Sequence, residues 1–172
     1  MNKIKKEKMS DKIISRLDSI LKPSGDFENY HWQINTWSKL HEGINFVRNA
    51  VFVEEQHISP ENVFSDSDIQ AVQMLVTTKK GRAFVGAAQL SKESVGVSRV
   101  AYFGVVYNHR GNHVGKLMLN QLSNFARRRR DRLLIAHVPT YAVVFFRKMG
   151  FEVFGEPFEA ANIAHVKMQL IL

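Results

Sequence analysis

The central stretch of the chain reads Ser98-Arg-Val-Ala-Tyr-Phe-Gly-Val-Val-Tyr-Asn-His-Arg-Gly-Asn-His-Val-Gly-Lys-Leu-Met-Leu-Asn-Gln-Leu122. Its first half is apolar and rich in valine and aromatic residues, a composition that favours a buried strand. In its second half apolar residues recur at helical spacing, at Val114, Met118 and Leu122 and then at Phe125. The stretch therefore predicts a strand that leads through a polar turn into an amphipathic helix.

The polar turn, residues 108–116, contains two glycines together with an arginine and a lysine. A strand that enters a helix through such a turn presents free backbone N–H groups and the positive end of the helix dipole. This arrangement binds phosphate or pyrophosphate groups. The alternative is a strand-to-helix turn without a ligand, because two glycines and an arginine also occur together by chance.

The same turn resembles the acyl-CoA pyrophosphate loop of the GNAT acetyltransferases, whose pattern is Arg/Gln-x-x-Gly-x-Gly/Ala. Arg110 fills the first position and Gly115 the last, whereas His113 stands where the family prefers glycine. The resemblance implies that N–H groups of residues 111–116 bind the pyrophosphate, with added charge from Arg110 and Lys116. The histidine matters if the backbone φ is positive there or if its side chain meets the phosphate.

A second segment, Val47-Arg-Asn-Ala-Val-Phe-Val-Glu-Glu-Gln-His-Ile58, resembles the Arg-x-x-Val-Phe-Val-x-Glu-Gln-x-Ile pattern of one bacterial branch of this family. The agreeing positions are Arg48, Val51, Phe52, Val53, Glu55, Gln56 and Ile58. In that branch the segment closes over the acceptor side of the acyl group. The resemblance therefore implies that Arg48 and Gln56 help to bind the acceptor.

Two nearby positions depart from that branch. The branch commonly has an aspartate followed five residues later by a histidine, and here Asp68 is kept but Gln73 replaces the histidine. The branch also often has an arginine near the position of Gln89. We retain Asp68 as a third residue expected on the acceptor side.

A third segment, residues 140–151, resembles the Ala-x-x-Phe-Tyr-x-x-x-Gly-Phe helix of the family. Its matching positions are Ala142, Phe145, Gly150 and Phe151. The tyrosine that usually protonates the leaving thiolate is replaced by Phe146, which has no proton to give. Tyr141 or water would have to substitute, or the thiolate leaves unassisted, or the chain is a poor catalyst. The C-terminal pattern of Phe158 and residues 165–168, His-Val-Lys-Met, also resembles the branch.

Taken together, the resemblance covers about residues 34–172 and implies a GNAT fold. This is an α/β (α+β) fold with a mixed, largely antiparallel central sheet, helices on both faces and two central strands that splay apart. We expect an N-terminal extension at 1–30, with a short helix in residues 10–21, and the acyltransferase domain at 31–172. Further strands are expected near 31–37, 71–77, 82–90, 133–138, 151–158 and 165–171, and a further helix at 37–52.

The implied reaction is N-acetyl transfer from acetyl-CoA, the co-substrate, to a primary amine of a small molecule or peptide by direct attack. Pantetheine would lie between the splayed strands. The residues expected to bind the co-substrate are Val105, Tyr107, Arg110, Gly111, Asn112, His113, Val114, Gly115, Lys116 and Phe146. Glu54 and Glu55 are the candidate catalytic bases, with Asp68 behind them, although each also fits an ordinary surface carboxylate.

Composition sets the remaining limits. A chain of 172 residues with 45% hydrophobic and 23% charged residues is typical of one soluble globular domain. Because the chain has no cysteine, disulfides and thiolate metal sites are excluded, and the histidine spacing predicts no metal site. There is no apolar run long enough for a membrane span and no secretory signal pattern, so we expect a cytoplasmic protein.

The net charge of +8 indicates an anionic partner but does not choose among coenzyme A, nucleic acid and acidic membrane. The arginine run at 127–132 indicates a solvated helix end, since no aromatic stacking surface accompanies it. A membrane partner is not expected, nucleic acid is disfavoured, and a homodimer is left open. Three rival functions remain: a catalytically weak CoA- or metabolite-binding protein, an acyl-homoserine-lactone-type synthase, and a nucleic-acid binder.

Overall fold

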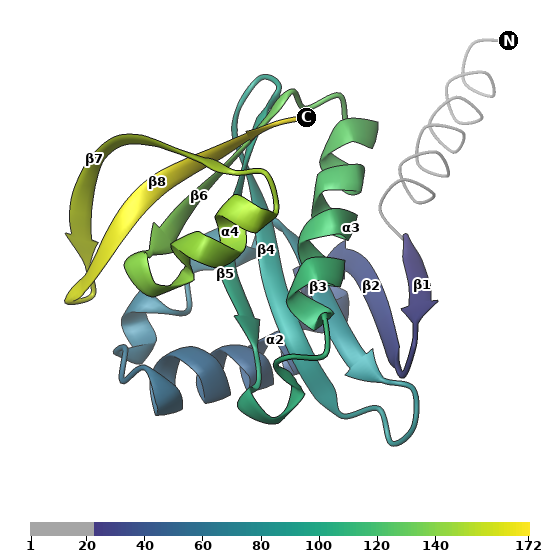
Figure 1. The fold of residues 1–172 in the computed structure, drawn as a ribbon. Helices are drawn as coiled ribbons and strands as arrows, with labels where there is room; N and C mark the ends of the chain where they lie inside the picture. The colour runs from purple at the N-terminus through teal and green to yellow at the C-terminus, as the bar shows by residue number, and fades with distance from the viewer. Residues whose placement is uncertain (1–22) are drawn as a thin grey trace, which may run out of the picture.

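The computed structural model describes residues 23–172, and the predicted N-terminal helix lies outside these residues. Eight strands form one sheet in the order β1-β2-β3-β4-β5-β6-β8-β7 (Figure 1). The strands are β1 Ser24–Phe27, β2 Tyr30–Thr36, β3 Val72–Thr78, β4 Phe84–Ser94, β5 Val97–Val105, β6 Leu133–Pro139, β7 Glu152–Ala160 and β8 Ile163–Ile171. The α-helices are α2 Trp37–Arg48, α3 Val114–Arg128 and α4 Val143–Lys148.

Five short helical turns complete the described elements. They are the π-helical turn η1 Asn49–Glu55 and the 3-10 turns η2 Pro60–Asn62, η3 Asp66–Ile69, η4 Tyr107–His109 and η5 Thr140–Ala142. Across residues 23–172, none of the helices has both the length and the apolar character needed to cross a bilayer.

The sheet is antiparallel except at its centre, which confirms the predicted mixed architecture. β5 and β6 are parallel, and they pair only from Val97↔Leu133 to Val100↔Ala136. Beyond these four pairs the two strands diverge, while β6 stays paired with β8 as far as Pro139↔His165. The splay expected from the family resemblance is therefore present in the described chain.

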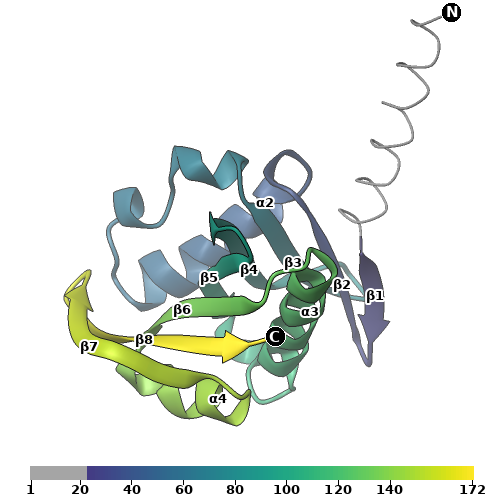
Figure 2. The ribbon, with the colours of Figure 1, turned by 90° about the horizontal axis from the view of Figure 1, so that it is seen from above.

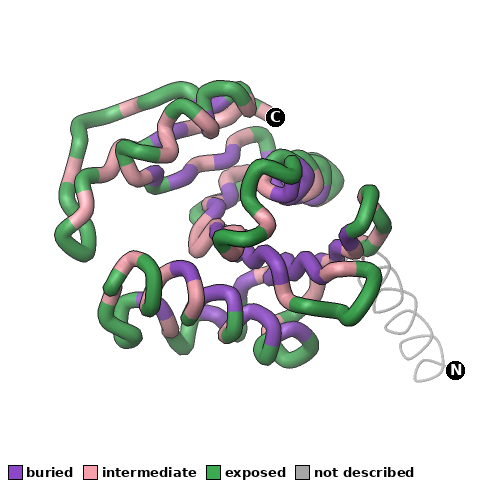
Figure 3. The backbone as a smooth tube through the Cα atoms, turned by 60° about the horizontal axis from the view of Figure 1, so that its bottom comes forward, coloured by how far each residue is buried: buried purple, intermediate pink, exposed green. Residues whose placement is uncertain are grey.

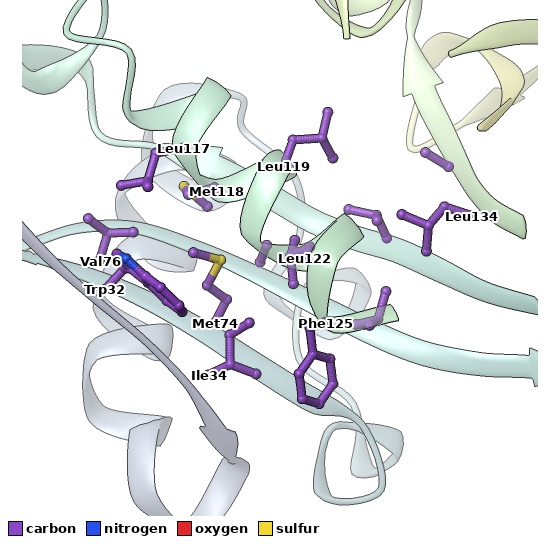
Figure 4. Close-up of a cluster of buried hydrophobic side chains, with 14 of the residues drawn as sticks. Trp32, Ile34, Met74, Val76, Leu117, Met118, Leu119, Leu122, Phe125 and Leu134 are labelled. Atoms are coloured by element: carbon purple, nitrogen blue, oxygen red, sulfur yellow. The ribbon is translucent and has the colours of Figure 1, made fainter. Parts of the chain in front are cut away.

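The two faces of the sheet carry separate cores. On one face, the apolar stripe of α3 packs on β3, β4 and β5, and Figure 4 shows Leu117, Met118 and Leu122 above Met74 and Ile34 of the same cluster. On the other face, α2 packs around Ile44 and Leu75. In Figure 3 the buried segments follow the central strands and the inner sides of α2 and α3. Successive side chains of a strand point to opposite faces of the sheet, so Met74 packs under α3 whereas Leu75 packs under α2.

A β-bulge shapes β5 beside the splay. Between the pairs Ala87↔Gly104 and Gln89↔Ala101, β5 holds one residue more than β4. Tyr102 lies in this interval with φ of 46°. Such bulges bend a strand and redirect its side chains. A Cβ atom at Gly104 would lie 3.0 Å from Val51 Cγ1, so glycine allows η1 to pack closely on this part of β5.

Three local features differ from the sequence predictions. The helix predicted for 37–52 is α-helical only to Arg48 and continues as η1. The edge strand β1 lies where the sequence indicates only the stop of a helix, because four residues with a glycine give no alternation to detect. The third matching segment begins as the 3-10 turn η5, and α4 starts only at Val143.

Candidate functional site

The turn between β5 and α3 has the form expected of a phosphate-binding loop. The first backbone hydrogen bond of α3 runs from the Leu117 N–H to the His113 carbonyl at 2.9 Å. The N–H groups of residues 114–116 therefore precede the helix's own hydrogen-bond ladder, at the positive end of a 15-residue helix. Gly111, with φ of 78°, and Asn112 are exposed ahead of the helix, and Lys116 is exposed in its first turn. Their role in binding a phosphate stays a prediction.

His113 adopts the backbone conformation of the glycine that it replaces. It is the N-cap of α3, with φ of 59° and ψ of 8°. Histidine is among the residues that tolerate the left-handed region, but the conformation still costs free energy for any residue with a Cβ atom. The side chain is exposed, so the fold accepts the substitution at a local cost in backbone strain.

Replacing His113 with glycine should stabilise the protein. We expect the free energy of unfolding to rise by about 0.5–1 kcal/mol, because glycine has no Cβ penalty at positive φ. Urea denaturation followed by circular dichroism measures the change. The matched control is Asn120→Gly, an exposed position inside α3, where glycine should instead cost about 1 kcal/mol. Equal destabilisation by both variants would contradict the assigned strain.

Arg110 is bound to one of the candidate bases. Its Nη1 and Nη2 donate to Glu55 Oε1 and Oε2 at 2.8 and 2.7 Å, and its Nε donates to the Val105 carbonyl at 2.8 Å. The hydrogen bonds to Glu55 raise the pKa of Arg110 above its ordinary value. This bidentate pair joins η1 to the loop across the carboxyl end of β5. Glu55 is therefore not free to accept a proton unless the pair opens.

The other predicted residues on this side are distributed as follows. Glu54 is exposed and accepts a 2.6 Å hydrogen bond from Asn49 Nδ2. Gln56 ends η1 and is half-buried. Tyr107 is largely exposed, with the Arg110 guanidinium carbon 5.5 Å from its ring centroid. Of these three residues, Glu54 is the carboxylate, and it binds Asn49 rather than any residue of the phosphate-binding loop.

Phe146 lies in the core, where it contacts other aromatic rings. Its ring centroid is 5.8 Å from Phe103 on β5, 5.4 Å from Phe145 and 5.2 Å from Phe151, each edge to face. Its contact with Phe103 places it behind the splayed part of β5. Aromatic packing of this kind explains why the helix tolerates phenylalanine at the position where the family has tyrosine.

Tyr141 lies on η5, with its side chain mostly exposed. Partial burial raises the pKa of its phenol above the ordinary value, and the charge of Glu55 raises it further, while Arg110 opposes this. The phenol thus stays protonated at neutral pH and lies close enough to the Glu55–Arg110 pair to sense both charges. Since η5 precedes α4, helical periodicity does not decide where this side chain points.

Arg48 and Asp68, expected on the acceptor side, are instead buried and bind each other. Arg48 Nη1 donates to Asp68 Oδ2 at 2.8 Å, and both side chains are almost fully buried. Arg48 Nη2 donates to Gln89 Oε1 at 2.7 Å and more weakly to Gln73 Oε1 at 3.3 Å. The guanidinium carbon lies 4.0 Å from the centroid of the Tyr102 ring. The cluster thus connects α2, η3, β3 and β4 beneath the bulge.

The two departures from the branch pattern meet in this cluster. Gln73 and Gln89 each present an amide oxygen to Arg48, and Gln73 Nε2 also donates to the Asp68 carbonyl at 3.1 Å. Two neutral amides therefore surround a buried ion pair. Sequence reasoning noted each substitution separately and had no signal that they face the same guanidinium.

Comparison with known proteins gives three findings. A family model described as acetyltransferase (GNAT) domain matches residues 41–172. The Bacillus subtilis proteins YyaT, uncharacterised, and YjcF, an uncharacterised N-acetyltransferase, are 26% and 28% identical to this chain. The alignments cover 79% and 72% of this chain and 91% and 86% of the relatives. A crystal structure from Lactobacillus plantarum, provisionally named an N-acetyltransferase, superposes with a TM-score of 0.76 at 21% identity. The superposed part covers 83% of this chain and 98% of the Lactobacillus plantarum chain.

Proposed function

The chain belongs to the GNAT acetyltransferase domain family, and from this premise we propose that it transfers the acetyl group of acetyl-CoA to the amine of a small molecule by direct attack. One observation carries the proposal. The parallel pairing of β5 and β6 stops at Val100↔Ala136, and β5 then runs into a loop with free N–H groups at the start of α3. A pantetheine arm fits such a splay, and a pyrophosphate fits such a loop.

The residues that would hold acetyl-CoA follow from this geometry. N–H groups of residues 114–116 and the ammonium of Lys116 would bind the pyrophosphate, and Arg110 would join them if its pair with Glu55 opens. The unpaired edge of β5 beyond Val100 would offer backbone groups to the pantetheine. Val105 uses its carbonyl for Arg110 Nε, so this oxygen also becomes available when Arg110 moves.

The chemical step needs three proton-handling events. The ammonium of the acceptor loses a proton, and its nitrogen attacks the thioester carbon to form the C–N bond. The C–S bond then breaks and CoA leaves as a thiolate. The second proton of the former ammonium leaves, and the thiolate takes up a proton. Phe146 does not supply that proton, whereas the phenol of Tyr141 is protonated and near the Glu55–Arg110 pair. Water is the other donor.

Replacing Glu55 with glutamine should tighten acetyl-CoA binding several-fold while turnover persists. The substitution removes a negative charge beside the phosphate loop and releases Arg110 from a strong bidentate partner. Isothermal titration calorimetry with acetyl-CoA measures the affinity. Glu54→Gln is the matched control for the affinity alone, because Glu54 binds Asn49 and not the loop. Weaker binding in Glu55→Gln, or a complete loss of turnover, would mean that Glu55 acts directly on the substrates.

The function is tested by combining binding and turnover. Titration with acetyl-CoA and with CoA should give saturable binding, and acetyl transfer should release thiol in the presence of an amine. Ellman's reagent reports this thiol without reacting with the protein, because the chain has no cysteine. Tight CoA binding without thiol release for any amine would support the second candidate, a catalytically weak CoA-binding GNAT protein, which Phe146 favours. No binding of either compound would contradict both.

A further inference from the structure

One face of the C-terminal part of the sheet carries a group of cations and imidazoles beside the splay. In the strand registers, Arg99 pairs with Ile135, His137 with Lys167 and Phe158 with His165. Since directly opposed residues share a face, these side chains project to the same side of the sheet. The alternate residues of β6 and β8, such as Val138 and Met168, fill the core on the other side. We call the set Arg99, His137, Phe158, His165 and Lys167 the His137 face.

The His137 face lies on the side of the sheet that bears α2, and Figure 2 shows α2 over β3–β5 rather than over β6–β8. His137 is the first residue of β6 beyond its last pair with β5, Val100↔Ala136. It is therefore next to the point where the two strands separate. With the pyrophosphate at the start of α3 and the pantetheine along β5, the acyl end of the co-substrate would lie toward this point. His137 and Lys167 are both exposed.

The two imidazoles on this face are held in place by Phe158. The His137 and Phe158 rings meet edge to face with centroids 5.1 Å apart, and the Phe158 and His165 rings stack at 5.5 Å. His165 Nδ1 lies 2.7 Å from the Ile163 carbonyl. A carbonyl only accepts hydrogen bonds, so Nδ1 carries the hydrogen and Nε2 remains available to a ligand. Three strands thus fix the orientation of these rings.

Positive charge dominates the surroundings of His137. Partial burial lowers its pKa below the ordinary value, Arg99 and Lys167 lower it further, Glu93 opposes them with a smaller effect, and His165 adds the smallest decrease. Arg99 forms an ion pair with Glu93 at 2.7 Å, which leaves Lys167 as the cation without an acidic partner among the described residues of this face. His137 is consequently neutral at pH 7 and is able to accept a proton.

We propose that the His137 face is the acceptor subsite and that it takes an amine which also carries a carboxylate or a phosphate. This inference rests on the proposed acetyl transfer and names its substrate class. The acidic group of the acceptor would bind the ammonium of Lys167, whereas a simple alkylammonium would be repelled by it. The same positive potential lowers the pKa of a bound amine and so favours the neutral nucleophile that the reaction requires.

His137 has a defined part in this reaction. A ring nitrogen takes one proton from the bound ammonium, and the freed amine attacks the thioester carbon. The C–N bond forms and the C–S bond breaks. The nitrogen then loses its second proton, which neutralises the thiolate, and the proton on His137 passes to solvent. The sum is one amide, one CoA thiol and one released proton.

The test compares acceptors that differ only in their acidic group. The pairs are 4-aminobutanoate and butylamine, L-phenylalanine and phenethylamine, and O-phosphoethanolamine and ethanolamine, each assayed by thiol release from acetyl-CoA. We expect at least one acid-bearing member to exceed its partner by about tenfold or more in kcat/KM. Lys167→Met should remove this preference through KM, while Lys80→Met, at the exposed β3–β4 turn, should leave it intact. Equal rates within all pairs, or faster simple amines, would overturn the inference.

His137→Gln gives the second readout. It should lower kcat by about 100-fold with both members of a pair, as loss of a proton acceptor does, and leave calorimetric acetyl-CoA affinity unchanged. Unchanged kcat would remove His137 from the reaction.

If acetyl-CoA binds but no amine reacts, the imidazole NMR signals of His137 and His165 decide. They should shift saturably with 4-aminobutanoate or O-phosphoethanolamine and not with butylamine. Absence of such shifts overturns the subsite but leaves the proposed function standing. Absence of acetyl-CoA binding itself counts against the proposed function.

Discussion

Replacing Arg48 with methionine is expected to lower the free energy of unfolding by about 3–5 kcal/mol, the usual cost of breaking a buried ion pair from one side. Asp68 would keep its charge in the interior and would lose its 2.8 Å partner. The amide oxygens of Gln73 and Gln89 would lose their donor at the same time. Urea denaturation, read as the shift in the midpoint at constant slope, measures the loss.

Two further variants make this result specific. Arg127→Met removes an exposed guanidinium that donates to Asn124 at 3.3 Å, and it should change the stability by less than about 1 kcal/mol. The double variant Arg48→Met/Asp68→Asn should recover part of the loss, because no unpaired charge stays buried. A double variant as unstable as Arg48→Met alone would show that the packing of Arg48 against Tyr102, 4.0 Å from its ring centroid, matters more than its charge.

Arg110→Ala should raise the Kd for acetyl-CoA by about 10- to 100-fold, the effect of one lost charge-assisted phosphate contact. The loss has two components, because removing Arg110 also leaves the Glu55 carboxylate unpaired beside the phosphate loop. The double variant Arg110→Ala/Glu55→Gln should therefore bind more tightly than Arg110→Ala. Calorimetry on the single and the double variant separates the two components, and both should shrink at higher salt, because salt screens attraction and repulsion alike.

Lys92→Ala is the matched control for this experiment. Lys92 is exposed on β4, pairs across the sheet with Ser98 at the opposite end of β5 from the loop, and should leave the affinity unchanged. An unchanged Kd in Arg110→Ala would mean that the guanidinium serves only to hold Glu55 in place.

The sequence predicted the central strand, the turn and the helix well because their signals are local. Apolar alternation ends at the polar turn, helical spacing begins after it, and the structure confirms β5 and α3 within one or two residues at their starts. The fold class then followed from resemblance in three segments. The edge strand β1 was missed because its pairing with β2, and not its composition, makes it a strand.

The candidate site was less predictable because its key contacts join distant parts of the chain. Glu55 and Arg110 are 55 residues apart, and each was expected to face a substrate rather than the other. Arg48 meets Gln89 across 41 residues. A motif identifies such residues but says nothing about which charges neutralise each other in the folded chain. At His113, by contrast, the sequence analysis asked whether the backbone φ is positive, and the structure shows that it is.

The short parallel ladder between β5 and β6 also has a mechanical meaning. In the described chain, four residue pairs join a five-stranded antiparallel unit, β1–β5, to a three-stranded one, β6, β8 and β7, next to hydrogen bonds from the Arg132 and Leu133 N–H groups to the Gly96 carbonyl. Beneath α3, Leu134 and Met168 of the second unit join the same hydrophobic core as Val100 of β5. Because the parallel ladder is short and the strands diverge beyond it, we expect a change in the angle between the two units to break few residue pairs.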